Sequence, residues 1–137
     1  MRRTPKELLL ALVSYAIASV IFTWPMAMGL GNKLPIDLGD PILTSWLMAW
    51  GQESITRGPA GINGIMNAPM FFPNTLVFAF TENLLGLAIP LSPIWFLTHN
   101  AALVGGVALL ICFTLNGFTA YLLARELKAA PMGAAIA

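Results

Sequence analysis

Residues 8–30 read LLLALVSYAIASVIFTWPMAMGL, a run of 23 positions without a charged side chain. About 20 consecutive apolar residues suffice to cross a bilayer as a helix. Arg2, Arg3 and Lys6 precede the run, as is typical of the cytoplasmic end of a membrane helix. We therefore expect residues 1–7 in the cytoplasm and a transmembrane helix over residues 8–30.

A cleaved signal peptide is the competing interpretation of this run, because its MAMG end has the small residues of a cleavage site. The run exceeds the roughly 7–15 apolar residues of a typical signal, so the membrane helix is favoured. Pro25 is expected to kink or end the helix. Trp24 lies where aromatic side chains meet the membrane surface.

The whole chain has the composition of a membrane protein. Of its 137 residues, 58% are hydrophobic and 9% are charged, against roughly a quarter charged in soluble domains. The net charge of +1 gives no basic excess, so we expect no nucleic-acid partner. The single cysteine, Cys112, excludes an intrachain disulfide and a cysteine metal cluster.

A second uncharged run, AALVGGVALLICFTLNGFTAYLL, predicts a transmembrane helix over residues 101–123. Small and polar residues on it are suited to close packing against other membrane helices: Gly105, Gly106, Asn116, Gly117 and Thr119. Residues 124–137 are expected to form a cytoplasmic loop and the start of a further membrane helix. The chain would then be a fragment of a larger polytopic protein, with further membrane helices as partners.

Residues 77–98 (VFAFTENLLGLAIPLSPIWFLT) are long enough to span, yet they contain Glu82, Pro90 and Pro93. If they crossed, the cations after the second helix would lie opposite those at the N-terminus, against the positive-inside rule. We therefore expect an interfacial or re-entrant segment within an external segment of residues 31–100. The predicted fold class is an all-α integral membrane protein, with two transmembrane helices flanking an external segment that carries interfacial helices.

The external segment begins with LPIDLGDPILTSWLMAW, in which Asp40-Pro41 is a helix start signal, Asp40 as the N-cap. We expect an amphipathic interfacial helix over residues 41–57, with Glu53 and Arg57 paired near its end. Its apolar arc would comprise Ile42, Leu43, Trp46, Leu47 and Trp50, and its polar arc Thr44, Ser45, Gly51 and Gln52.

Asp40, Asp37 and Glu82 are the candidate catalytic residues. Each has an ordinary alternative role, as a helix cap for Asp40, a solvated turn residue for Asp37 and a cap or interfacial carboxylate for Glu82. A carboxylate at a membrane surface can also bind a metal ion or accept a hydrogen bond from a sugar hydroxyl. The cofactor is unknown, and a divalent cation is left open.

The tryptophans are interpreted as membrane-interface residues rather than sugar-stacking platforms: Trp24, Trp46, Trp50 and Trp95. His99 has no second histidine to form a metal site. The sequence contains no phosphate-binding glycine loop, nucleophile elbow or zinc-protease motif.

The order of these features resembles the N-terminal region of membrane glycosyltransferases with the GT-C fold. The matching stretches are IDLGDPILTSWLMAWGQ, NAPMFFPNT, ENLLG and YLLARELK. This superfamily includes protein O-mannosyltransferases, aminoarabinose transferases and oligosaccharyltransferases, and the chain looks closest to uncharacterised bacterial members. The resemblance covers nearly all of this chain but only the beginning of such an enzyme, which normally has eight or more membrane helices.

The resemblance implies transfer of a sugar from a polyprenyl-phosphate-linked donor at the extracytoplasmic face of the inner or plasma membrane. Asp40 would match the loop aspartate that acts as base or positions the acceptor. Pro41 departs from the mannosyltransferases, which have a glutamate there. The fragment alone is expected to be inactive. The alternatives are a polytopic transporter or lipid-handling protein, with the external helix as a gate, and a noncatalytic membrane subunit.

Overall fold

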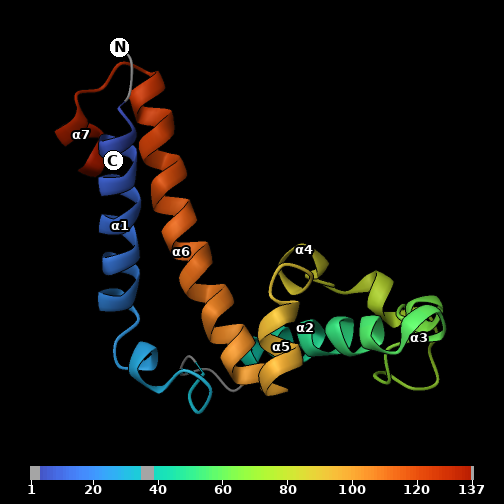
Figure 1. Ribbon diagram of the computed structural model, residues 1–137. Helices are drawn as coiled ribbons and strands as arrows, with labels where there is room; N and C mark the ends of the chain where they lie inside the picture. Colours follow the sequence, from blue (N-terminus) through green and yellow to red (C-terminus); the bar gives the residue numbers. More distant parts are fainter. Residues whose placement is uncertain (1–3, 35–38, 137) are drawn as a thin grey trace. The chain divides into compact units, whose positions relative to one another are not determined.

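The structure is a computed structural model that describes residues 4–34 and 39–136. Every regular element in these ranges is helical (Figure 1). The chain forms two compact units, a terminal unit of Met1–Met28 with Leu109–Ala137 and a central unit of Gly29–Ala108. Helix α6 (Ala101–Glu126) contributes its first turns to the central unit and the rest to the terminal unit.

Helix α1 (Pro5–Phe22) begins with a capping interaction, because the Thr4 hydroxyl accepts a hydrogen bond of 3.2 Å from the backbone N–H of Glu7. The helix ends earlier than the predicted range of 8–30. Pro25 has no N–H to continue the backbone ladder, and a separate short helix, η1 (Met26–Gly29), follows.

In the terminal unit, α1 and α6 run antiparallel. The Glu7 carboxylate contacts Arg125 near the start of α1, and the hydroxyl groups of Ser19 and Thr114 lie 3.1 Å apart near its other end. Helix α7 (Pro131–Ile136) joins them through a hydrogen bond of 3.3 Å from the Tyr15 hydroxyl to the Ala135 carbonyl.

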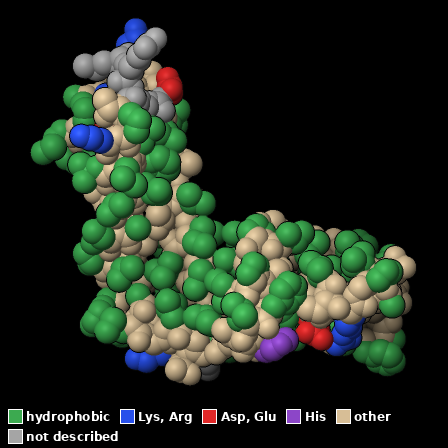
Figure 2. All heavy atoms as spheres, viewed as in Figure 1, with side chains coloured by type: hydrophobic (Ala, Val, Ile, Leu, Met, Phe, Trp, Pro, Cys, Tyr) green, Lys and Arg blue, Asp and Glu red, His purple; other side chains and the backbone are tan. Residues whose placement is uncertain are grey.

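Among the described residues, α1 and α6 are the helices long and apolar enough to cross a membrane. Both expose large apolar side chains, such as Phe22 at 87% and Leu123 at 62%. Hydrophobic side chains are spread along both helices, and the charged ones of this unit gather near the beginning of the chain (Figure 2). Helix α6 extends three residues beyond the predicted range of 101–123 and includes Arg125.

The central unit consists of short helices around the longer α2. The predicted interfacial or re-entrant segment 77–98 forms three separate short elements, and none of them is long enough to span a bilayer. The elements of this unit before α6 are α2 (Asp40–Thr56), α3 (Gly58–Gly64), η2 (Val77–Phe80), α4 (Leu85–Ala88) and α5 (Ser92–Thr98).

The polar arc predicted for α2 is wrong, because the structure buries most of it. Ser45 and Gln52 are 4% and 0% exposed, while Ile42 and Leu43 from the predicted apolar arc are 46% and 40% exposed. The Gln52 amide Nε2 donates a hydrogen bond of 2.9 Å to the Ala88 carbonyl, so its burial on this face is partly compensated. Leu47 of the predicted apolar arc is 1% exposed, so both arcs of α2 contribute buried side chains.

A glycine of α6 allows this helix to approach the buried polar arc of α2. A Cβ atom at Gly105 would overlap the Ser45 hydroxyl oxygen and would lie 3.2 Å from the Ser45 Cβ. Beside this contact lies a core cluster of Met48, Ala88, Leu91, Val104 and Ala108. The absence of a side chain at Gly105 therefore sets the separation of α2 and α6.

We predict that Gly105→Ala destabilises the protein by up to about 2 kcal/mol, because overpacking costs roughly 1–3 kcal/mol and the gain in helix propensity offsets about 1. Thermal unfolding in lipid nanodiscs measures the effect. The matched control is Gly86→Ala, since a Cβ at Gly86 meets open space. Adding Ser45→Gly should cost less in the Gly105→Ala background than in the unsubstituted protein, because it relieves the overlap. Equal effects of Gly105→Ala and Gly86→Ala would contradict the role of this contact.

Candidate functional site

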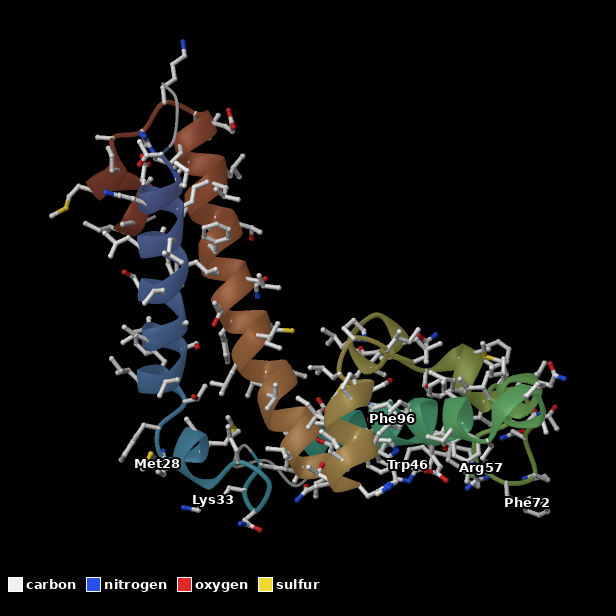
Figure 3. The ribbon with its side chains drawn as sticks, in the orientation of Figure 1. Met28, Lys33, Trp46, Arg57, Phe72 and Phe96 are labelled. Atoms are coloured by element: carbon white, nitrogen blue, oxygen red, sulfur yellow. The ribbon has the colours of Figure 1, made fainter. Side chains whose placement is uncertain are left out.

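A pocket of about 610 Å³ in the central unit contains two of the three candidate carboxylates. Asp40 comes from the first turn of α2, and Glu82 follows η2. Phe72 points away from the neighbouring helices (Figure 3), whereas the adjacent Phe71 lines the pocket. The lining residues are Asp40, Leu43, Thr44, Leu47, Met70, Phe71, Ala79, Phe80, Thr81 and Glu82.

Two hydrogen bonds fix the return of the chain toward α2. The backbone N–H of Phe78 donates to the Met66 carbonyl over 3.0 Å, and that of Leu76 donates to the Asn67 side chain over 2.9 Å. Phe78 is fully buried in a cluster with Leu47 of α2. These contacts hold η2 against α2, and Glu82 consequently lies on the same pocket as Asp40.

The interpretation of Asp40 as an N-cap is wrong. Gly39 occupies the N-cap position of α2, Asp40 is the first helical residue, and no side-chain capping hydrogen bond is formed at this end. A helical backbone at Asp40 carries its side chain outside the N-cap geometry, in which the carboxylate would accept backbone N–H groups. The exposed carboxylate of Asp40 instead lines the pocket.

The polar side chains of the pocket present hydrogen-bond acceptors. The Thr44 hydroxyl donates to the Asp40 carbonyl over 2.9 Å, and the Thr81 hydroxyl donates to the Phe78 carbonyl over 3.2 Å. Both hydroxyls therefore retain acceptor capacity beside the two carboxylates. No Lys, Arg or His is among the lining residues, so the pocket suits a ligand that donates hydrogen bonds and has no negative charge.

Asp37 lies outside the described residues, so its place relative to this pocket stays a prediction. Within residues 4–34 and 39–136, no group of three or more His, Cys, Asp or Glu side chains could hold a metal ion. The described part of the pocket thus offers two carboxylates to a divalent cation.

The tryptophans predicted at the membrane interface differ in their surroundings. Trp46 (Figure 3) and Trp50 stack with ring centroids 6.2 Å apart, and the Trp50 indole N–H donates to the Ile65 carbonyl over 2.8 Å. Both pack against the core of the central unit. Trp95 is half-buried and makes an edge-to-face contact with the His99 ring, and Trp24 is 62% exposed.

Sequence reasoning missed a polar cluster in the terminal unit. One carboxylate oxygen of Glu7 accepts hydrogen bonds from the Tyr121 hydroxyl at 2.6 Å and from Arg125 Nε at 2.8 Å. The Arg125 side chain is 4% exposed. The sequence feature that could have predicted this cluster is a single acidic residue at the start of one apolar run and a cation just after the other. These two charges pair when the helices run antiparallel.

The predicted pair of Glu53 and Arg57 is confirmed at 3.4 Å.

No protein-family model matches the chain, and searches of curated proteins and of solved structures found no match.

We predict that Asp40→Asn and Glu82→Gln each change the free energy of unfolding by no more than about 0.5 kcal/mol, as for surface positions without structural partners. Chemical or thermal unfolding in nanodiscs measures this change. Arg125→Met is the contrasting variant and should lower the melting temperature, because it removes a buried cation and two of its hydrogen bonds. A large loss of stability in Asp40→Asn would assign that carboxylate a structural role.

Proposed function

We propose that this chain is part of a membrane glycosyltransferase of the GT-C kind, which transfers a sugar from a polyprenyl-phosphate-linked donor. The observation that carries the proposal is the convergence of Asp40 and Glu82 on one pocket. The whole chain has only six acidic residues, and these two come from separate segments, the first turn of α2 and the loop after η2. A pair of carboxylates beside hydroxyl acceptors suits the binding and activation of a sugar or other hydroxyl-bearing acceptor.

The membrane placement in this proposal relies on the terminal unit. Helices α1 and α6 would cross the bilayer as an antiparallel pair, with the contact between Glu7 and Arg125 near one surface. In the sequence, five of the seven Lys and Arg residues come before or in the first turn of α1, or in or after the last turn of α6: Arg2, Arg3, Lys6, Arg125 and Lys128. The positive-inside rule makes this end cytoplasmic, and the central unit, which connects the two spans, would lie on the extracytoplasmic side.

We assign Asp40 as the base and Glu82 as the residue that orients the acceptor. Asp40 would take the proton of the acceptor hydroxyl while the oxygen forms a bond to the anomeric carbon. The bond from that carbon to the donor phosphate breaks, and the phosphate leaves with the electron pair.

The pocket would serve the acceptor rather than the donor phosphate. Two carboxylates would repel a phosphate, and the lining residues supply no cation to offset the repulsion. The donor phosphate would therefore be bound by groups outside this pocket, including those of further membrane helices. This division is consistent with an inverting transfer, in which the acceptor oxygen attacks the anomeric carbon from the side opposite to the departing phosphate.

The test measures transfer of radiolabelled sugar from polyprenyl-phosphate donors in membranes of cells that express the intact gene product. Asp40→Asn should lower transfer by roughly 10²–10⁴-fold, the usual contribution of a positioned base, without lowering protein abundance. Glu82→Gln should also reduce transfer, mainly through a higher KM for the acceptor.

The matched control is Glu53→Gln, since Glu53 pairs with Arg57 and does not line the pocket. It should transfer sugar at the unsubstituted rate. Unchanged transfer by Asp40→Asn would refute the assigned base. No transfer by the unsubstituted protein from any polyprenyl-phosphate donor would instead favour a transporter or a noncatalytic membrane subunit.

A further inference from the structure

The terminal unit contains a second cavity, a groove of about 380 Å³ formed by α1, α6 and α7. This volume lies within the roughly 300–1,000 Å³ of small-molecule sites. Its walls are mostly apolar and are separate from the Asp40 pocket. The groove is lined by Glu7, Leu10, Ala11, Ser14, Tyr15, Ala18, Tyr121, Pro131, Met132 and Ala135.

The groove exists because one face of α1 carries small side chains. Ala11, Ser14 and Ala18 leave the face shallow, and α7 lies beside it through the hydrogen bond from Tyr15 to Ala135. The wall residues Leu10 and Met132 are 69% and 79% exposed. An apolar ligand in the groove would cover these two side chains.

Charge is concentrated at the Glu7 end of the groove. The Glu7 carboxylate is itself neutralised by Arg125 at 2.8 Å. In the sequence, Lys6 directly precedes Glu7. Lys128 falls between Arg125 and Pro131, which lines the groove. Lys6 and Lys128 are exposed, and neither takes part in the ion pairs of Arg57 with Glu53 and of Arg125 with Glu7. Glu126, the last residue of α6, is a second carboxylate at this end. Lys6, Arg125 and Lys128 outnumber Glu7 and Glu126, so the described residues here carry a net charge of +1.

We propose that this groove binds one acyl chain of an anionic phospholipid, with the lipid phosphate at Lys6 and Lys128. The apolar walls match a hydrocarbon chain, and the lysines match the negative headgroup; cations next to membrane helices attract anionic lipids in this way. The groove lies on helices with the length and apolar surface to cross a bilayer, where hydrocarbon is the surrounding solvent. The inference rests on membrane insertion, and it is independent of the chemistry assigned to Asp40.

The test reconstitutes the full chain in membranes with equal amounts of phosphatidylglycerol and phosphatidylcholine that have identical acyl chains. After extraction into a mild detergent, native mass spectrometry counts the retained lipids. The unsubstituted protein should retain phosphatidylglycerol about tenfold or more over phosphatidylcholine, given the attraction of two lysines for an anionic headgroup. Excess inorganic phosphate should not displace it, since the acyl chain contributes to binding.

Ala11→Phe fills the groove and should abolish retention of the lipid. Val13→Phe is the matched control, because Val13 is 45% exposed on α1 and does not line the groove. Ser14→Leu is a milder filling that keeps the test valid if Ala11→Phe accumulates poorly. Changing both Lys6 and Lys128 to Gln should remove the preference for phosphatidylglycerol while a lipid is still retained.

Four results would overturn the proposal. They are no retained lipid, equal retention of the two lipids by the unsubstituted protein, full retention by both filled variants, and displacement by inorganic phosphate alone. Sugar transfer by the same preparations is measured separately. A protein that transfers sugar but shows no lipid preference would refute this inference and leave the glycosyltransferase proposal standing.

Discussion

Close approach to α6 at residues without a side chain is the constraint on which both units depend. In the central unit, Gly105 leaves room for Ser45 of α2, and a Cβ at Gly106 would lie 2.6 Å from a methyl group of Leu30. In the terminal unit, a Cβ at Gly117 would lie 2.7 Å from a ring carbon of Tyr15. At these points α6 therefore packs within each unit through its backbone rather than through large apolar side chains.

The helices could be predicted from the sequence, but the buried face of α2 could not. The uncharged runs predicted α1 and α6, and Asp40-Pro41 predicted the start of α2 to within one residue. The assumption that polar residues of α2 face away from the core failed at Ser45 and Gln52. A small hydroxyl fits under α6, and a long amide reaches the Ala88 carbonyl. Periodicity measures polarity, whereas burial here depends on size and on available hydrogen-bond partners.

The candidate site was predictable in its residues and not in its geometry. Asp40 and Glu82 drew attention because acidic residues are rare in this chain. Their convergence depends on the turn that carries η2 back to α2, in which Leu76 adopts a left-handed backbone with φ of 58°. A non-glycine residue in that conformation is uncommon and gives no signal in the sequence. The prediction that Asp40 caps α2 failed for a related reason, since the chain enters the helix one residue earlier, at Gly39.

The few charges of this chain have two different uses. Glu7 and Glu53 are paired with arginines, at the contact of α1 with α6 and along α2. Within residues 4–34 and 39–136, Asp40 and Glu82 form no such salt bridge, and both lie on a pocket without a cation in its lining. An unpaired carboxylate gives little stability to an apolar fold and remains available to accept a hydrogen bond or a proton. Pairing with an arginine therefore distinguishes Glu7 and Glu53 from the two carboxylates that line the pocket.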